Sequence, residues 1–217
     1  MSALMPEPLD STLATLKNAA LSLPKEQRFD YLEWTILKAD LIGREKNFSF
    51  PSLAIPNKIS EYDYNRLLKD KQNIVNKYYK INSSGTEYII STKKTDVQDD
   101  DKALIIHNTI LRRCGVVWVD FGYNIGVEFG GRHPAVIIQN FRHSLLVAPL
   151  SSQHPTNEAI NVTVNNVYGF EKKTRYVNVL RLRVVSILRV DLASNKGSVK
   201  GSVVDGIINM AQAKVFK

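Results

Sequence analysis

Cysteine is nearly absent from this sequence: only Cys114 occurs among the 217 residues, so the chain can form no internal disulfide. A reducing, cytoplasmic environment is therefore expected, and the position of Cys114 at the start of an apolar run favours a packed thiol over a reactive one. No apolar run reaches the roughly eighteen residues that a membrane-spanning helix needs. The first residues also lack the basic start and apolar centre of a secretory signal.

Several sequence motifs that bind cofactors or mark enzyme classes are also missing. There is no Gly-x-x-x-x-Gly-Lys loop for nucleotide phosphates, no dinucleotide-binding glycine fingerprint and no Gly-x-Ser-x-Gly nucleophile turn. His133, His143 and His154 lie far apart in the sequence, without paired thiols and with few acidic residues nearby. Metal sites in proteins combine closely spaced ligands, so the sequence predicts neither a metal ion nor a cofactor.

The positive charge of the chain is concentrated in its second half. Residues 1–112 contain 16 basic and 15 acidic side chains, a net charge of +1, whereas residues 113–217 contain 13 and 6, a net charge of +7. A basic half next to a neutral half favours a polyanionic partner, most simply a nucleic acid, for the basic half. Charge that only keeps the protein in solution is the alternative.

The first 112 residues are predicted to form a mainly helical region of unknown role. Apolar residues recur at helical spacing over 11–23 and 25–44, where Pro24 separates the two segments, and again from Ser60 to about residue 81. The pattern Ser60-x-x-Asp63 is typical of a helix N-terminus. A short strand over 86–92 and a further helix over 101–112 complete this region.

Residues 113–217 change to the pattern of short strands separated by turn residues. Strands are predicted over 115–121, 134–139, 144–150, 159–164 and 175–185, and a last helix over 203–216 with Ser202 as its cap. Five or six short strands followed by one helix are typical of a small barrel. The predicted fold is therefore α+β, with a helical N-terminal region before a β-barrel domain.

The second half resembles the MazF/PemK family of toxin endoribonucleases. The resemblance covers residues 113–217 and lies in six segments: Arg113-x-x-Val116, Trp118-Val119-Asp120-Phe121-Gly122, Gly126-x-Glu128-x-Gly130-Gly131, Pro134-Ala135-Val136-Ile137-Ile138-x-Asn140, Leu146-Val147-Ala148-Pro149-Leu150-Ser151-Ser152-Gln153 and Leu182-Arg183-Val184-Val185. It implies an SH3-like barrel with a C-terminal helix, usually dimeric. It also implies cleavage of single-stranded RNA without a metal, and an antitoxin protein as partner.

The resemblance implies a set of catalytic residues, with two replacements. His133 stands where the family has an arginine, and Ser151 stands where it has a catalytic threonine. Because imidazole titrates near neutral pH, His133 is expected to act as a general base or a general acid. As a base it would remove the proton of the RNA 2′-hydroxyl, and as an acid it would protonate the leaving oxygen. Ser151 is expected to donate a hydrogen bond to the phosphate, and Arg132 or Arg183 to bind the phosphate charge.

Further residues around these positions are expected to contact RNA. Arg181 and Arg183 lie two residues apart, so on one strand they would share a face, which is unfavourable without an anion opposite. Tyr123 is the aromatic residue expected to stack on an unpaired base. The complete set of expected RNA contacts is Tyr123, Glu128, Gly130, Gly131, Ser152, Gln153 and Arg181.

Each of these residues also has a structural interpretation. His133 could support the strand that follows, Arg132 could be a solvated surface charge, Gly130 and Gly131 could form a tight turn, and Ser151 could end a strand. At the level of function, the first hypothesis is a toxin-type endoribonuclease that works without a metal. The second is a catalytically degenerate barrel that acts as an RNA-binding or protein-interaction module, and the third is an interaction protein whose N-terminal helices recognise a partner.

Overall fold

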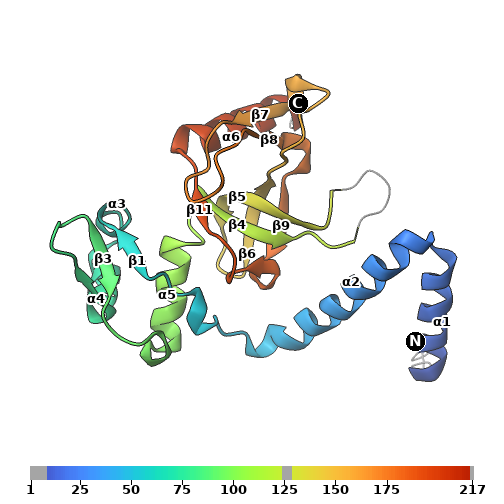
Figure 1. Ribbon diagram of the computed structural model, residues 1–217, viewed down its shortest axis with the longest axis horizontal. Helices are drawn as coiled ribbons and strands as arrows, with labels where there is room; N and C mark the ends of the chain where they lie inside the picture. Colours follow the sequence, from blue (N-terminus) through green and yellow to red (C-terminus); the bar gives the residue numbers. More distant parts are fainter. Residues whose placement is uncertain (1–8, 124–128, 216–217) are drawn as a thin grey trace, which may run out of the picture.

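Two helices at the start of the chain form a hairpin that projects from the rest of the molecule (Figure 1). The computed structural model describes residues 9–123 and 129–215, and this hairpin consists of α1 (Leu9–Ser22) and α2 (Lys25–Arg44). The helix predicted over 25–44 is confirmed at both ends, and the one predicted over 11–23 is shifted by one or two residues. Within the described ranges, no helix is both long and apolar enough to cross a membrane.

A small three-stranded sheet occupies part of the region that was predicted to be helical. Its strands are β1 (Lys58–Ser60), β2 (Tyr79–Ile81) and β3 (Glu87–Ile90), paired antiparallel in the order β1-β3-β2. The strand predicted over 86–92 is thus confirmed. The continuous helix predicted from Ser60 to about 81 is wrong, because the chain forms α3 (Glu61–Asn65) and α4 (Lys69–Tyr78) and then enters β2.

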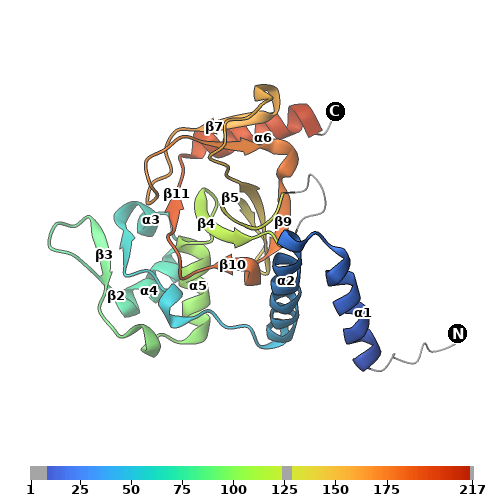
Figure 2. The ribbon, with the colours of Figure 1, turned by 45° about the vertical axis from the view of Figure 1, so that its right-hand side comes forward.

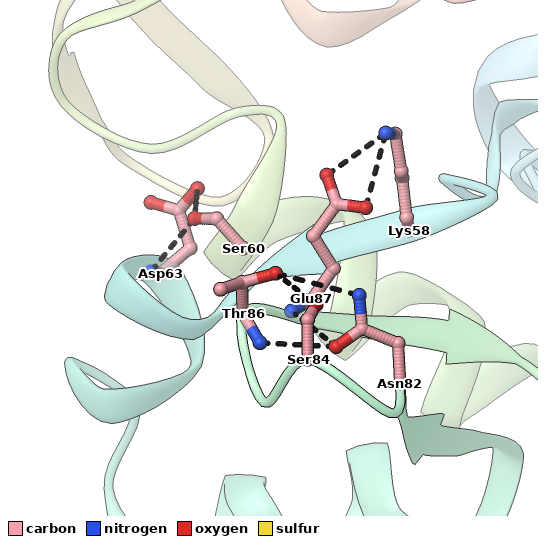
Figure 3. A network of polar contacts seen from close by, with 7 residues as sticks. All are labelled: Lys58, Ser60, Asp63, Asn82, Ser84, Thr86 and Glu87. Atoms are coloured by element: carbon pink, nitrogen blue, oxygen red, sulfur yellow. Dashed lines mark hydrogen bonds and ion pairs between the residues drawn. The ribbon is translucent and has the colours of Figure 1, made fainter.

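The start of α3 has the cap that the sequence predicts. The Ser60 hydroxyl oxygen accepts a hydrogen bond from the Asp63 backbone N–H at 3.1 Å, and its O–H donates to the Asp63 carboxylate at 2.9 Å (Figure 3). Close to this cap, the Asn82 side-chain oxygen accepts from the backbone N–H of Thr86 at 3.0 Å and so closes the β2–β3 turn. These contacts satisfy backbone donors that would otherwise be left at the helix end and in the turn.

The helix α5 (Asp99–Thr109) connects the small sheet to the barrel, and Figure 1 shows it between the two. It begins two residues before the predicted start and has three aspartates in its first turn, where the helix dipole favours negative charge. Two polar contacts tie it in place. Arg112 pairs with Asp63 of α3 at 2.7 Å, and the Asn140 amide of the barrel donates to the Leu111 carbonyl at 2.8 Å.

The C-terminal half forms a curled antiparallel sheet covered by one helix, which confirms the predicted small barrel with a C-terminal helix. Figure 2 shows the sheet edge-on, with helix α6 (Gly201–Val215) across its upper end. The sheet order is β10-β4-β5-β6-β9, with β11 also paired to β4, and a separate pair, β7-β8, joins the sheet through a bridge between Ser151 and Tyr176. The bounds are β4 (Gly115–Asp120), β5 (Arg132–Asn140), β6 (Ser144–Pro149), β7 (Asn161–Val164), β8 (Arg175–Asn178), β9 (Arg183–Ser186), β10 (Val190–Asp191) and β11 (Gly197–Ser198).

Two details of the predicted second half are wrong. The strand predicted over 175–185 is divided into β8 and β9 by a turn of 3₁₀ helix, η5 (Val179–Arg181). The final helix begins at Gly201, so Ser202 lies inside its first turn and is not its cap.

Both faces of the barrel sheet are buried. One face, with Val136 and Ala148, packs against Ile207 of α6. The opposite face, with Ile137 and Val147, belongs to one continuous hydrophobic cluster that also contains the buried residues of α4, α5 and the small sheet. The barrel and residues 50–111 therefore share a hydrophobic core, since alternate residues of each strand point to opposite faces.

Candidate active site

The strands β5 and β6 bring His133 and Ser151 together. These strands pair in a register that puts Ala135 opposite Pro149, and beyond it the Leu150 N–H donates to the Pro134 carbonyl at 2.8 Å, so Ser151 follows β6 at the end of the sheet where His133 lies near the start of β5. Both side chains line one surface hollow of ≈ 660 Å³, whose wall consists of Trp118, Phe129, Gly130, Arg132, His133, Pro134, Leu150, Ser151, Ser152, Gln153, Phe170, Glu171, Lys173, Arg175, Arg181 and Asn195.

His133 is half-buried against the ring of Phe129, with 4.4 Å between the two ring centroids. Burial lowers the pKa of the His133 imidazole below its ordinary value of 6.5. A hydrogen bond to the backbone of Gly130 raises this pKa, and the positive charge of Arg181 lowers it. Because the pKa lies below 6.5, the imidazole is mostly neutral at pH 7 and can accept a proton.

Ser151 has a fixed backbone and an available hydroxyl hydrogen. Its backbone N–H and C=O both pair with Tyr176 of β8, at 2.9 and 2.8 Å. The Ser151 hydroxyl oxygen accepts a hydrogen bond from the Gln153 N–H at 3.1 Å, so its own O–H remains able to donate. Ser152 and Gln153, which follow it, also line the hollow.

Arg132 lines the hollow but is held by an acidic partner. Its guanidinium pairs with Asp191 and lies over the ring of Trp118, 5.0 Å from the ring centroid. Ser194 donates to the same Asp191 carboxylate at 2.8 Å. Because 49% of the Arg132 side chain is exposed, it is a surface charge, but one that is paired with a carboxylate. An arginine whose charge is already matched by a carboxylate also has less capacity to bind a phosphate.

Arg181 and Arg183 occupy different positions relative to the hollow. Arg181, at the end of η5, lines it and lies 5.0 Å over the Phe129 ring, next to His133. Arg183, at the start of β9, is not among the lining residues and lies 5.7 Å over the ring of Phe121. Because η5 is not part of a strand, the alternation argument that placed both on one strand face does not apply to them.

The other expected RNA contacts divide into three groups. Gly130 lines the hollow, and Gly131 has φ +72°, a conformation that favours glycine, so the tight-turn interpretation holds at that residue. Tyr123 lies outside the hollow: its hydroxyl donates to the Gln27 side chain of α2 at 2.9 Å. Glu128 lies outside the described residues.

The structure adds residues to the site that the sequence interpretation did not select. His154 borders a smaller cavity of ≈ 230 Å³ that shares Phe129, Ser151 and Arg181 with the main hollow. Its ring lies edge-on to Tyr176, and its Nδ1 donates to the Pro155 carbonyl at 3.1 Å, which leaves Nε2 available. Its position three residues after Ser151 is a sequence signal for the site, although from the sequence it is considered only as a metal ligand.

Aromatic and basic side chains also line the hollow. The rings of Trp118 and Phe170 stack with 6.1 Å between centroids, and the buried Arg175 lies 5.6 Å over Phe170.

As for metal binding, no three His, Cys, Asp or Glu side chains within residues 9–123 and 129–215 lie close enough together to hold an ion.

Comparison with known proteins finds a family to which the barrel half is similar. Residues 112–213 match the family described as PemK-like, MazF-like toxin of type II toxin-antitoxin system. Among solved structures, a MazF from Deinococcus radiodurans has 17% identity and a TM-score of 0.40, with 48% of this chain and 94% of that one covered. The Mycobacterium tuberculosis toxin MazF-mt6 has 13% identity and a TM-score of 0.35, with 45% and 92% covered. No curated protein matches the sequence.

Proposed function

Because residues 112–213 match the PemK-like, MazF-like toxin family, we propose that the protein is a toxin-type endoribonuclease that cleaves single-stranded RNA without a metal ion. The main structural support is the placement of His133 and Ser151 in one basic hollow. A hollow of this kind offers a proton acceptor, a hydrogen-bond donor and positive charge in one place. Those three functions are what cleavage by the RNA 2′-hydroxyl requires.

In the proposed mechanism, His133 takes the proton from the 2′-hydroxyl as that oxygen attacks the adjacent phosphorus. The bond from phosphorus to the 5′-oxygen breaks, and the products are a 2′,3′-cyclic phosphate and a 5′-hydroxyl. The lowered pKa of His133 suits this role, because a base must be unprotonated at the working pH.

Two other side chains stabilise the negative charge on the phosphate in this proposal. The Ser151 O–H donates to a phosphate oxygen, and the Arg181 guanidinium replaces the Arg132 or Arg183 clamp expected from the sequence. Arg181 is preferred because it lines the hollow, and no acidic side chain among the described residues pairs with it. Bidentate binding of a phosphate by a guanidinium needs such free N–H donors.

The departing 5′-oxygen needs a proton, and His154 is the candidate donor. It borders the smaller cavity, which shares the Ser151 and Arg181 side chains with the hollow that His133 lines. Its Nε2 is the atom that can carry a second proton, because Nδ1 is already bonded to a carbonyl. The family also implies two protein partners, a second copy of the chain and an antitoxin, and we propose both.

The direct test is incubation of the protein with single-stranded RNA in the presence of EDTA. We expect fragments that end in a 2′,3′-cyclic phosphate, and we expect a 2′-deoxy substitution at the cut site to block cleavage. Equal cleavage of the deoxy substrate would exclude attack by the 2′-hydroxyl.

The alternative function is an RNA-binding barrel without catalysis. The observation in its favour is that Arg132 is paired with Asp191 and that no arginine occupies the position of His133. Such a protein would bind RNA in a strongly salt-dependent way without producing fragments, and His133→Ala would leave its affinity unchanged.

A further inference from the structure

Three arginines of the barrel lie in a row that begins at the hollow and ends at helix α2. We call Arg181, Arg183 and Arg189 the arginine row. Each guanidinium lies over an aromatic ring: Arg181 over Phe129 at 5.0 Å, Arg183 over Phe121 at 5.7 Å and Arg189 over Trp34 at 4.7 Å.

The members of the row are contiguous. The ring centroids of Phe129 and Phe121, under the first two arginines, are 5.5 Å apart. At the other end, burial lowers the pKa of Arg189, Asp120 opposes this effect, and Arg183 lies close enough to lower the pKa further. The row therefore connects the wall of the hollow, next to His133, to a side chain of the N-terminal hairpin.

The barrel has a position that accepts α2. Gly122 has φ +86°, and a Cβ atom at this residue would lie 2.6 Å from the Trp34 ring, so a residue with a side chain could not pack there without displacement. On the same segment, Tyr123 donates to Gln27 and meets the ring of Tyr31 edge-on at 5.5 Å between centroids. Figure 2 shows α2 running beside the barrel while α1 points away from it.

The first two charges of the row are not matched by acids. None of the acidic residues that the structure describes forms an ion pair with Arg181 or Arg183, whereas Arg113 and Arg132 of the same domain pair with Asp205 and Asp191. Adjacent unmatched like charges are unfavourable unless an anion binds there. Guanidinium groups already ordered by stacking on rings lose less freedom when they bind phosphates.

We propose that single-stranded RNA leaves the hollow along the arginine row and reaches α2, so that the N-terminal hairpin lengthens the RNA-binding surface. This inference rests on the endoribonuclease function proposed above. Arg183 and Arg189 bind successive phosphates, and the half-buried Trp34 ring provides the surface at which the path ends. Alternating positive charge and aromatic rings are typical of proteins that bind single strands without reading their sequence. The longer path affects how much RNA is bound, and the hollow alone carries out the cleavage.

The test compares oligonucleotides of two lengths on the full chain. Fluorescent random-sequence RNA with 2′-O-methyl groups at every position cannot be cleaved by 2′-hydroxyl attack, so binding is measured alone, by anisotropy over a series of salt concentrations. Lengths of about 4 and about 12 nucleotides lie at the lower end and in the upper part of the range of about 4 to 16 nucleotides that a single binding groove covers. Wild-type protein is expected to bind the longer probe more tightly, and Arg183→Gln to weaken that binding by about 5- to 50-fold while the shorter probe changes by less than about threefold.

Two further variants make the outcome decisive. Trp34→Ala is expected to weaken binding of the longer probe in the same way, and its circular dichroism spectrum and melting temperature show whether the fold is intact. Arg142→Gln is the control, because it removes an exposed arginine of the β5–β6 turn that lies outside the row. The affinities for both probes should change only slightly, since one charge far from the proposed path is lost.

The possible results separate this inference from the function on which it rests. If the wild type cleaves RNA but Arg183→Gln weakens both probes equally, or Arg142→Gln weakens the longer probe as much, the path is wrong and the nuclease stands. If Trp34→Ala strengthens binding, α2 covers the site instead of extending it, and the inference is also wrong. If the wild type neither binds nor cleaves RNA, the proposed function itself fails.

Discussion

Removal of the His133 imidazole is the most direct test of the proposed mechanism. The side chain is half-buried in the hollow that Ser151 also lines, and its lowered pKa makes it a proton acceptor at neutral pH. A positioned proton-transfer group contributes about 10²- to 10⁴-fold to a rate. His133→Ala should therefore lower kcat by that factor, which corresponds to ~3–5 kcal/mol of activation free energy.

The assay is the initial rate of cleavage of a fluorescent RNA in EDTA, with the melting temperature measured in parallel. His143→Ala is the matched control, since His143 is an exposed imidazole of the same barrel outside the hollow. Added imidazole should restore part of the His133→Ala rate, because the cavity left behind admits a small base. His133→Arg separates the two possible roles, because arginine can bind the phosphate but stays protonated and cannot act as a base. A His133→Arg variant as active as the wild type would refute the assignment of His133 as the base.

Three further perturbations test other parts of the molecule. Arg181→Gln removes a positive charge that lowers the pKa of His133, so this pKa should rise toward 6.5. In a normalised pH–rate profile, the loss of activity on acidification should then begin at a higher pH. An unshifted profile would contradict the contact between Arg181 and His133. Gly131→Ala should cost ~1–2 kcal/mol in the free energy of unfolding, measured by urea, because φ is +72°; the new methyl group would lie 3.8 Å from Nε2 of His133, an ordinary contact, so an unchanged stability would contradict the strain argument. Ile137→Ala should cost ~2–5 kcal/mol and lower the stability of the barrel and of residues 50–111 together, in one transition; two separate transitions would show that the shared core is not cooperative.

The sequence predicts the fold best where a pattern is long and local. Helix α2 is confirmed at both ends because Pro24 fixes its start and apolar residues recur through it. The segment 79–81 is different. Its apolar residues continue the helical spacing of α4, but they pair with β3, a contact made outside the segment. A short apolar run cannot be assigned to helix or strand by its spacing alone, so the strand could not be predicted.

In the candidate site too, local sequence features could be predicted, whereas contacts between distant segments could not. His133 and Ser151 could be selected because each flanks an apolar strand, and the pairing of β5 with β6 then brings them together. The partner of Arg132 could not be selected, since Asp191 is 59 residues away and belongs to a strand of only two residues. Arg181 is among the predicted RNA contacts, but its advantage over Arg183 depends on the turn η5, which no sequence pattern indicates.

The boundary that composition places between residues 112 and 113 does not coincide with a boundary in the hydrophobic core. Ile105 and Ile106 of α5 are fully buried in the same cluster as Ile137 and Val147 of the barrel. Burying one such side chain contributes about 1.5–3 kcal/mol, so a barrel cut at residue 113 would expose several of these side chains to water. The segment 50–111 therefore stabilises the barrel directly.

The α1–α2 hairpin differs, because it meets the barrel mainly where Trp34 packs on Gly122, beside the arginine row. The segment able to change the proposed RNA binding without loss of the fold is thus the hairpin, and this is where the N-terminal half can contribute to the proposed function.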